Sequence, residues 1–456
     1  MMRLSQAADA LDARLVGPDA AMAGVSTDSR SIQPGELFVA LRGERFDGRE
    51  FLATVAKSGA AGALVDEAGS ARGVPGLPMI VVADTRLALG ALAAHWRRRF
   101  SPVLIAVAGS NGKTTTKEML ASILRAAHAE AQVLATFGNL NNDIGLPLTL
   151  LRMTQAHRCC AIEVGMNHKG EIDYLAGIAA PTISVVTNAQ REHLEFMGSV
   201  EEVAEENSGV IRALPAEGVA VINGDDPHAD IFRRAAAGRR VVEFSLERDA
   251  TVGARWELRL LSSEIVLRCP AGEARATLSI PGLHNVRNAL AAAACAYAAG
   301  ISMEAIGVGL NAFRPYSGRL QVKRSAVGAT VIDDTYNANP DSVRAAIDVL
   351  AAAHGATVLV LGDMGEVGDQ GPDFHAEVGR YARERGIGGL LALGESTAHT
   401  VAGFGEGARH FASAEDLISA LRRRLAPEAT VLVKGSRFMR MERVVEALTG
   451  EAVGVH

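Results

Sequence analysis

Short apolar runs alternate with helical patterns along almost the whole chain, and this alternation predicts layered α/β domains rather than a repeat array or an all-β sandwich. A Ser199-x-x-Glu202 box predicts the start of one helix in the middle of the chain. The apolar runs that predict strands in this middle part are residues 103–107, 159–164, 183–187 and 219–223. We therefore expect a parallel sheet with helices on its faces.

The chain is too long for one hydrophobic core, because its 456 residues exceed the size at which single cores stop growing. The turn at Ser101-Pro102 and the segment 315–318 predict two domain boundaries. Further strand-like runs are residues 37–41, 63–65, 79–82, 330–333, 358–361, 390–393 and 431–433. The pattern predicts three domains over 1–98, 99–314 and 315–456, the last one Rossmann-like, with ligands in the clefts between them.

The composition is that of an ordinary folded protein, with 48% apolar and 21% charged residues. Lysine and arginine together number 46 against 52 aspartates and glutamates, which gives a net charge of −6 without any long block of one sign. Generic binding to nucleic acid or to an anionic membrane is therefore not expected.

The cysteines and the N-terminus both favour a cytoplasmic protein. The four cysteines form no C-x-x-C pair and are expected to be reduced, buried thiols: Cys159, Cys160, Cys269 and Cys295. Asp9 and Asp12 lie where a signal peptide would need an apolar core, and no apolar run reaches membrane-spanning length. We expect no membrane insertion.

A glycine-rich segment between the run 103–107 and a helical pattern predicts a phosphate-binding loop. The segment reads Gly109-Ser110-Asn111-Gly112-Lys113-Thr114-Thr115. Its backbone N–H groups would surround polyphosphate oxygens, with Lys113 at the β- and γ-phosphates and Thr114 on Mg²⁺. The general pattern has a glycine at position 107, where this chain has Val107, so the loop is a variant. A chance glycine turn before a helix is the alternative.

Two polar residues follow consecutive predicted strands of the middle part. Glu163 closes the run 159–164, and His193 follows the run 183–187. Because the carboxyl ends of parallel strands meet at one edge of a sheet, both side chains are expected near the phosphate loop, where they would hold Mg²⁺. Taken singly, each residue is better explained as a surface or capping group, and it is their joint placement after consecutive strands that favours a functional site.

Three further segments carry polar groups suited to a nucleotide or an anionic substrate. His284, Asn285 and Asn288 share one face of a predicted helix and would read a purine, although helix capping by Asn285 is an open alternative. The segment 333–341 brings paired carboxylates to a strand end, where they suit ribose hydroxyls or a metal, and Asp341 is explained as a helix cap. The segment 434–437, Lys-Gly-Ser-Arg, suits an anionic group.

Together these motifs resemble the Mur ligase superfamily, whose members are ATP-dependent amide-forming enzymes of peptidoglycan synthesis. The phosphate loop is similar to the family's short core, Gly-[Ser/Thr]-x-Gly-Lys-[Ser/Thr]-[Ser/Thr], which has no first glycine and accounts for Val107. The resemblance covers essentially the whole chain. It implies an N-terminal UDP-substrate-binding α/β domain, a central P-loop ATPase-like domain with a parallel sheet, and a C-terminal Rossmann-like domain.

Three segments resemble the family member that adds D-alanyl-D-alanine to UDP-N-acetylmuramoyl-tripeptide, namely residues 138–147, 163–172 and 362–368. The sibling that adds the third amino acid usually carries an Asn-Thr-Thr-Pro type segment in the first of these places and an Asp-Asn-Pro-Arg near its end, which this chain lacks. Residues 26–30 and 34–41 resemble the UDP-binding domain that both siblings share. The resemblance implies those two compounds as substrates of a monomeric enzyme, with ATP and Mg²⁺ as cofactors.

The resemblance also assigns site residues, position by position. Lys113, Glu163 and His193 would be catalytic, and Thr114, Glu163 and His193 would ligate Mg²⁺. The implied ATP site is Gly109, Ser110, Asn111, Gly112, Lys113, Thr114, Thr115, His284, Asn285, Asn288, Arg319 and Asp334. The implied substrate site is Thr27, Asp28, Ser29, Arg30, Arg45, Phe46, Asp47, Asn139, Asn141, Asn142, Tyr336, Asn337, Asn339, Lys434 and Arg437.

One position departs from the family pattern. Members commonly carry a carbamylated lysine on the helix after the His193 loop, where it ligates a second Mg²⁺. The corresponding residue here is Asn207, and no lysine occurs between Lys169 and Lys323. We hypothesise that Asn207, which we add to the catalytic set, or the neighbouring Glu205 or Glu206 takes over part of that role.

Other functions stay open at this point. The nearest are sibling ligases: one that adds the third amino acid, a folylpolyglutamate synthetase or a poly-γ-glutamate synthetase. A nucleotide-dependent switch and a P-loop kinase are alternatives from other classes. A tripeptide that ends in diaminopimelate and one that ends in lysine are both open, and no motif identifies the base that deprotonates the amine.

Overall fold

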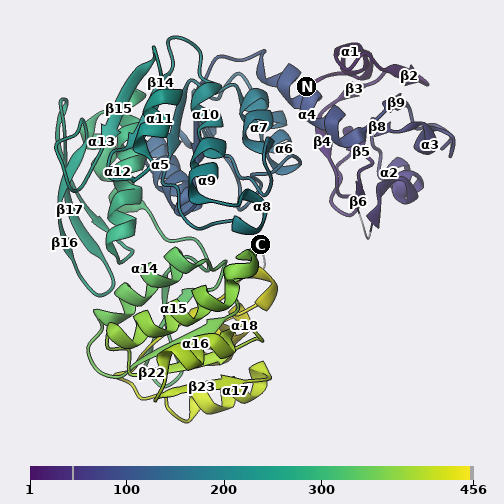
Figure 1. Cartoon of the computed structure of the whole chain (residues 1–456). Coiled ribbons are helices and arrows are strands. Elements are labelled where there is room, and N and C mark those ends of the chain that lie inside the picture. Colours follow the sequence, from purple (N-terminus) through teal and green to yellow (C-terminus); the bar gives the residue numbers. More distant parts are fainter. Residues whose placement is uncertain (44–45, 452–456) are drawn as a thin grey trace.

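The computed structural model describes residues 1–43 and 46–451, and in it each predicted domain is built on a large sheet of its own (Figure 1). The N-terminal sheet has five strands, and the central and C-terminal sheets have six each. The chain passes from the first sheet to the second after Arg97 and from the second to the third between Ala312 and Gln321. The exact boundaries at 98/99 and 314/315 stay a prediction.

The N-terminal sheet has the strand order β2-β9-β8-β5-β4, in which only β2 runs antiparallel to its neighbour. Two short antiparallel pairs, β1 with β3 and β6 with β7, lie beside it. The elements are β1 Met2–Arg3, α1 Leu4–Ala10, β2 Arg14–Val16, β3 Ala21–Met22, β4 Gly24–Ser26, β5 Glu36–Val39, β6 Arg42–Gly43, β7 Phe46–Asp47, a 3-10 turn Gly48–Phe51, α2 Leu52–Lys57, β8 Gly62–Val65, α3 Glu67–Ser70, β9 Met79–Val81 and α4 Thr85–Arg97.

The central sheet is entirely parallel, in the order β11-β12-β10-β13-β14-β15. Its elements are β10 Val103–Ala108, α5 Lys113–Ala127, a 3-10 turn Glu130–Gln132, β11 Val133–Ala135, α6 Gly145–Leu151, β12 Cys159–Glu163, α7 Glu171–Ala179, β13 Ile183–Val186, α8 Leu194–Met197, α9 Val200–Asn207, α10 Gly209–Arg212, β14 Val219–Asn223, α11 Ala229–Ala235, β15 Arg240–Phe244, α12 Leu283–Ala298 and α13 Met303–Ala312. The predicted strands and the N-cap at Ser199 are confirmed, since the Ser199 side chain accepts a hydrogen bond from the Glu202 N–H.

A second, antiparallel sheet in the central domain was not predicted from the sequence. It consists of β16 Gly253–Leu258, β17 Ser263–Cys269 and β18 Gly272–Leu278. β17 and β18 alternate buried positions with more exposed ones instead of forming apolar runs, because only one face of each strand packs on the core, and β16 has no buried position. The edge of the molecule on the left of Figure 1 is this sheet.

The C-terminal sheet has the order β19-β20-β24-β21-β22-β23, with β19 antiparallel and the other strands parallel. This is the Rossmann-like pattern with one reversed edge strand. The elements are β19 Gln321–Arg324, β20 Thr330–Asp334, α14 Pro340–Ala351, β21 Thr357–Gly362, a 3-10 turn Gly368–Gln370, α15 Gly371–Glu384, β22 Gly389–Leu393, α16 Thr397–Phe404, β23 Ala408–Phe411, α17 Ala414–Arg422, β24 Thr430–Lys434, a 3-10 turn Arg437–Met439 and α18 Glu442–Thr449.

The central strands are apolar throughout because helices cover both faces of their sheet. Along β10, Ile105 and Val107 belong to the core under α5 and α12, whereas Leu104 and Ala106 belong to the core under α4 and α7. The second core also contains Leu64 and other N-terminal residues, so the first domain is anchored on the second. Val107, the departure from the general phosphate-loop pattern, is a fully buried strand residue.

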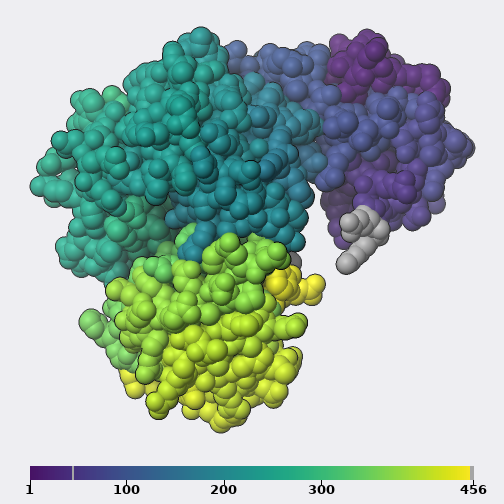
Figure 2. Space-filling model, viewed as in Figure 1, coloured from purple at the N-terminus to yellow at the C-terminus, as the bar shows by residue number. Residues whose placement is uncertain are grey.

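The three domains enclose a space at their junction. In Figure 2 the C-terminal domain packs broadly against the central domain, while a hollow separates it from the N-terminal domain on the face that is shown. Within residues 1–43 and 46–451, no helix is both long and apolar enough to cross a bilayer.

Candidate active site

The phosphate loop leaves the middle of the central sheet, where its neighbours supply the rest of the site. In the register of β10 with β12, Val107 is opposite Glu163, and in the register with β13, Ala108 is opposite Val186. The loop after Ala108, the carboxylate of Glu163 and the loop after Val186 therefore meet at one edge of the sheet, as the sequence predicted.

Two glycines give the loop its shape. Gly109 has φ +123, and a Cβ there would lie 2.2 Å from Thr187 Oγ1. Gly112 has φ +83, and a Cβ there would lie 2.2 Å from Asn288 Oδ1. Neither backbone angle nor space allows a side chain at these two positions, so the loop packs closely against Thr187 and Asn288 before α5 begins.

Thr114 and Glu163 form a polar pair below the loop that fits a divalent cation. Thr114 Oγ1 donates to Glu163 Oε1 at 3.1 Å, and Asn141 Nδ2 donates to the same oxygen at 2.8 Å. Glu163 is 1% exposed, and its Oε2 has no hydrogen-bond partner. A buried, unpartnered carboxylate oxygen beside a threonine hydroxyl is a donor set that Mg²⁺ prefers.

Lys113 is folded back over the loop. Its ammonium donates to Gly109 O at 2.6 Å, to Ser110 O at 2.9 Å and to both carboxylate oxygens of Glu192 at 3.2 Å. The Lys113 and Glu192 side chains are 14% and 11% exposed. A compact ammonium in this position has only to turn to reach a bound phosphate.

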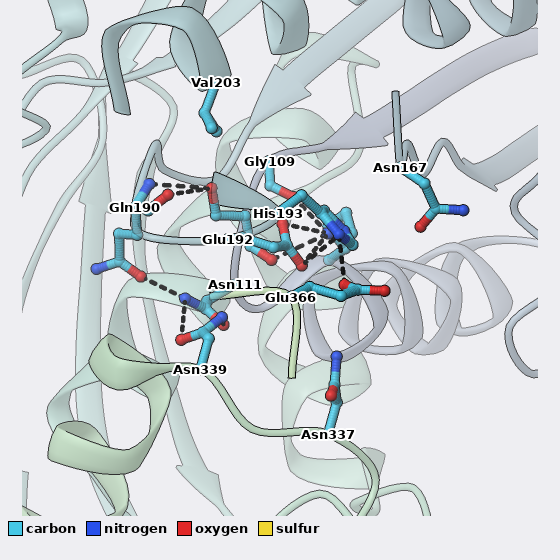
Figure 3. A network of polar contacts seen from close by, with 12 residues as sticks. Gly109, Asn111, Asn167, Gln190, Glu192, His193, Val203, Asn337, Asn339 and Glu366 are labelled. Carbon is cyan, nitrogen blue, oxygen red and sulfur yellow. Dashed lines mark hydrogen bonds and ion pairs between the residues drawn. The ribbon is translucent and has the colours of Figure 1, made fainter. Parts of the chain in front are cut away.

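The loop between β13 and α8 connects the phosphate loop with the C-terminal domain (Figure 3). Residues 190 and 192 contact the phosphate loop, and residues 191 and 193 contact the C-terminal domain. Gln190 N donates to Ser110 Oγ at 2.9 Å, and Glu192 holds Lys113. Between them, Arg191 contacts α14 and α15, and His193 Nδ1 lies 2.6 Å from Glu366 Oε2. One short segment thus touches both the phosphate site and the domain opposite it.

His193 and Glu366 are both held in left-handed backbone conformations, with φ +52 and +59. Such angles are uncommon for residues other than glycine and persist only where the surroundings enforce them. The contact with the His193 imidazole lowers the pKa of the Glu366 carboxyl below its ordinary value. Two strained residues from different domains thus face each other across the cleft.

An ion-pair group ties Arg191 to the C-terminal domain. Its guanidinium donates to Asp341 Oδ1 at 2.6 Å and to Glu377 Oε2 at 2.7 Å, and it lies 5.1 Å from the centre of the Phe374 ring. Arg344 reaches Glu377 as well, at 3.0 Å. Burial alone would lower the pKa of Arg191, but its hydrogen bonds to these carboxylates raise it.

Asp341 therefore has a different role from the one expected. The N-cap of α14 is Asn339, whose side chain accepts from Ser342 N at 2.8 Å. The interpretation of Asp341 as the helix cap is wrong, because its carboxylate is turned to Arg191. Asn339 also pairs with Asn111 of the phosphate loop, Nδ2 to Oδ1 at 2.9 Å.

The residues that we expected at the adenine line a cavity of about 560 Å³ between the central and C-terminal domains. Asn285 Nδ2 donates to Pro281 O at 2.7 Å, and Asn288 Nδ2 donates to Asn285 Oδ1 at 3.1 Å. The capping alternative for Asn285 is wrong, since the N-cap of α12 is Gly282. The lining also includes Asn111, Gly112, Thr115, Asn188, Asp225, His228, His284, Arg319, Asp334 and Lys434.

His284 gives the chain a pH-dependent stability. Burial lowers the pKa of its imidazole from 6.5 to about 4, so between these values the unfolded chain binds a proton that the folded chain rejects. Stability from this group is lost as the pH falls from 6.5 to 4, up to about 3 kcal/mol. The difference in unfolding free energy between wild type and His284→Gln should shrink over this range; a constant difference would contradict the assignment.

A smaller cavity of about 190 Å³ adjoins the phosphate loop on the other side. Asn141, Asn142, Tyr336, Asn337 and Asn339 of the expected substrate set line it together with Lys113, Thr114, Glu163, Glu192 and His193. Arg319 bridges the domains here: its Nη2 donates to Thr114 Oγ1 at 3.3 Å, and its guanidinium stacks 3.9 Å from the Tyr336 ring centre.

Asp334 and Lys434 end neighbouring parallel strands and are directly opposite each other in the register. Lys434 Nζ donates to Asp334 Oδ2 at 2.6 Å and to Asn337 O at 2.8 Å. Burial lowers the pKa of Lys434, and the nearby Asp334 opposes that shift. This pair lines the larger cavity, where Asp334 accepts from Leu320 N as well.

Asn207 does not fit the role of a cation ligand. It is 1% exposed, its Oδ1 accepts from Gly109 N at 2.8 Å, and its Nδ2 donates to Val203 O at 2.9 Å. Both ends of the amide are thus occupied: the oxygen braces the phosphate loop, and the nitrogen bonds back to its own helix. The neighbouring Glu205 lies 3.6 Å from Arg234, and Glu206 accepts from Gly170 N and Ile172 N. Because these side chains are bonded elsewhere, the structure does not support the hypothesis that Asn207, Glu205 or Glu206 ligates a cation.

Replacing Asn207 with alanine should therefore destabilise the loop and leave cation binding intact. Gly109 N–H would lose its partner in a buried place, at a cost of about 1–3 kcal/mol in unfolding free energy. Denaturant unfolding measures this loss. Because position 207 has no amine to carbamylate, ADP release by the wild type should be the same in buffer freed of carbon dioxide. Strong bicarbonate dependence would contradict this account.

Some expected substrate residues lie away from both cavities. Arg437 pairs with Glu442 at 2.8 Å, and Asn139 is exposed. In the N-terminal domain Arg30 holds Asp28 and lowers the pKa of that carboxyl to about 2, Asp47 pairs with Arg49, and Phe46 stacks on Phe51. Thr27 and Ser29 are half-buried beside Asp28. Arg45 lies outside the described residues.

The sequence reading missed four residues of the loop and its partners: Arg191, Glu192, Glu366 and Glu377. Arg191 and Glu192 carried the same signal as His193, a polar residue shortly after a strand end. Glu366 and Glu377 became visible only when the domains were placed together. Over the described part of the chain, no three His, Cys, Asp or Glu side chains form a ready metal site, so a cation here also needs oxygens from a bound phosphate.

A phosphate loop on a parallel sheet, facing a Rossmann-like domain across a polar cleft, defines a nucleotide-dependent enzyme of several domains. Family models match three successive parts of the chain: the Mur ligase family catalytic domain at residues 21–97, the Mur ligase middle domain at 107–296, and the Mur ligase glutamate ligase domain at 318–437. The chain belongs to the Mur ligase family.

Individual relatives agree along the full length. The chain is 40% identical to UDP-N-acetylmuramoyl-tripeptide--D-alanyl-D-alanine ligase of Escherichia coli, over 98% of each chain. The crystal structure of MurF from Acinetobacter baumannii is similar with a TM-score of 0.89 at 35% identity, again over 98% of each chain. MurF of Thermotoga maritima in complex with ADP has a TM-score of 0.82 at 26% identity and covers 93% of this chain and 96% of its own.

Proposed function

We propose that the chain is an ATP-dependent amide ligase that joins D-alanyl-D-alanine to UDP-N-acetylmuramoyl-tripeptide through an acyl phosphate. The observation that carries this proposal is the full-length similarity to a ligase of that name, at 40% identity over 98% of the chain. The cleft supports it, because residues of the phosphate loop and of the C-terminal domain line one cavity. The products are the pentapeptide precursor, ADP and phosphate.

The reaction needs activation, because a carboxylate is a poor electrophile. The carboxylate of the tripeptide attacks the γ-phosphorus of ATP in line, an oxygen of the carboxylate becomes the bridge of the acyl phosphate, and ADP leaves. Lys113 neutralises the charge that develops on the γ-phosphate oxygens, and Arg319 approaches the same place from the C-terminal domain. The dipeptide amine then attacks the acyl carbon, and phosphate leaves with the bridging oxygen.

Thr114, Glu163 and His193 are the residues that would hold Mg²⁺, which when bound offsets the charge of the phosphate oxygens. His193 is oriented by its contact with Glu366, and Glu163 by Asn141. The adenine would lie against Asn285 and Asn288 in the larger cavity. Thr114, Glu163, Asn285 and Asn288 are buried in the cleft, and exclusion of water around them would protect the acyl phosphate from hydrolysis.

The N-terminal domain would hold the UDP end of the tripeptide substrate. Its Asp28 and Asp47 turns lie outside the two cavities, and Figure 2 shows a hollow between the N-terminal and C-terminal domains. An extended peptide is the part of the substrate that would cross it.

ADP release tests the assignment against its alternatives. The assay uses UDP-N-acetylmuramoyl-tripeptide ending in diaminopimelate or in lysine, alone and with D-alanyl-D-alanine, free glutamate or free diaminopimelate. The proposal expects release that depends on the dipeptide with at least one tripeptide. Dependence on another amine would instead indicate a sibling ligase, and turnover indifferent to every amine would indicate a nucleotide switch.

A further inference from the structure

The antiparallel sheet β16–β18, at one side of the molecule in Figure 1, has two edges that differ in what covers them. Helix α13 covers the β18 edge: Asn311 Oδ1 accepts from Thr277 N at 2.9 Å, and Asn311 Nδ2 donates to Arg275 O at 3.4 Å. Within residues 1–43 and 46–451, no second strand pairs with β16 and no side chain bonds to its backbone. The β16 edge therefore offers a row of open backbone donors and acceptors.

The hairpin register shows which residues of β16 face outward. At the turn, Arg259 N donates to Ser262 O at 2.9 Å, and the two strands continue antiparallel from there. Because hydrogen-bonded pairs alternate along an antiparallel ladder, residues 257 and 255 bond to β17. The backbone N–H and C=O groups that point outward are those of Ala254, Trp256 and Leu258.

The same strand carries apolar side chains that the core does not cover. Trp256 is opposite Ile265 of β17 and therefore lies on the core-facing side of the sheet. Ile265 is 2% exposed, but Trp256 is 39% and Leu258 47% exposed. The core thus ends below β17, and the apolar surface of the edge strand would gain from a further strand beside it.

The sequence of β16 is complementary to itself when two copies run antiparallel about a twofold axis at Trp256. Trp256 is then opposite its own copy, and Ala254 is opposite Leu258, so every outward backbone group lies in a hydrogen-bonded pair. On the other face Arg255 is opposite Glu257, twice by symmetry. Arg255 has no ion-pair partner in the described part of the chain, and the arginine paired with Glu257 is 3.7 Å away.

We propose that the chain forms a homodimer in which two β16 strands pair in this register and join the two antiparallel sheets into one. The dimer stands in place of the monomer that the family resemblance implies. Charged residues on an edge usually prevent pairing, but here their signs alternate and match. They also select the register, because a shift by two residues places Arg255 or Glu257 opposite its own copy, where like charges repel.

Sedimentation equilibrium of the full chain, from about 1 to about 100 µM, tests the proposal in the range of a small interface. Wild type should change from one chain to two as its concentration rises. Arg255→Glu and Glu257→Arg should each weaken association at least about tenfold, because each variant makes both symmetric charge pairs repulsive. An equimolar mixture of the two variants should dimerise as wild type does, because a negative edge then meets a positive one.

Arg275→Glu is the matched control, because Arg275 is an exposed arginine of the same sheet on the edge that α13 covers. It should dimerise as wild type does. Recovery of the dimer in the mixture also shows that both edge variants are folded. Wild type that stays a single chain, Arg255→Glu that dimerises like wild type, or a mixture that stays monomeric would overturn the proposal. The ligase assignment is independent of these outcomes and is tested by dipeptide-dependent ADP release.

Discussion

Replacing Lys113 with methionine is expected to lower kcat for ADP release about a thousandfold. Lys113 is the lysine of the phosphate loop, with its Nζ 2.6 Å from Gly109 O, and methionine keeps most of its length without its charge. Charge on the phosphate oxygens rises as the reaction proceeds, so the loss acts mainly on kcat. The measurement is steady-state ADP release with both substrates, together with the affinity for ADP, which should change far less.

Lys113→Arg should recover little of this loss, since a planar guanidinium does not fit the space of a compact ammonium between the loop carbonyls and phosphate. Lys169→Met is the matched control: Lys169 pairs with Glu202 at 3.0 Å on the surface and is 56% exposed. It should retain wild-type kcat. A Lys113→Met variant that is folded and within tenfold of wild type would contradict the role of Lys113.

Replacing Arg191 with methionine is expected to open the cleft. The variant leaves Asp341 and Glu377 without their shared cation, and both bridge the central and C-terminal domains through it. Breaking this partly buried pair should cost the closed arrangement about 2–3 kcal/mol, which corresponds to about a hundredfold shift toward open forms. Small-angle X-ray scattering should show a larger radius of gyration, and kcat/KM for the dipeptide should fall at least about tenfold.

Arg233→Met separates this effect from the general loss of an ion pair. Arg233 also contacts two carboxylates, Glu243 at 2.6 Å and Asp230 at 2.7 Å, but all three belong to the central domain. The control should keep the wild-type radius of gyration and kcat/KM. If Arg191→Met scatters like wild type while losing activity, the ion pairs do not hold the domains together.

The sequence predicted the elements whose signal is local. An apolar run predicts β10, and a helical pattern predicts α5. Two glycines predict the turn between them, and the structure leaves no room for a side chain at either glycine. Glu163 and His193 were placed beside the loop because parallel strands end at one edge. The sheet β16–β18 was missed because its strands bury one face only and carry no continuous apolar run.

Contacts between residues far apart in the sequence could not be predicted from single segments. Asp341 looked like a helix cap, because an acidic residue after Asn-Pro suits that role, and its contact with Arg191 lies 150 positions away along the chain. Asn207 was taken for a ligand because its position follows the family's lysine, whereas its amide braces Gly109 from a distance of 98 positions. Such assignments depend on where other elements are placed, which no local pattern contains.

The central claim, ligation through an acyl phosphate, is tested most directly by following oxygen. The reacting carboxylate of UDP-N-acetylmuramoyl-tripeptide is labelled with ¹⁸O on both oxygens and incubated with ATP, D-alanyl-D-alanine and the enzyme, and the phosphate and the peptide product are analysed by mass spectrometry. The account predicts one ¹⁸O in the released phosphate and one in the new amide for each pentapeptide that forms. Phosphate without ¹⁸O, or label transfer without any amide product, would contradict it.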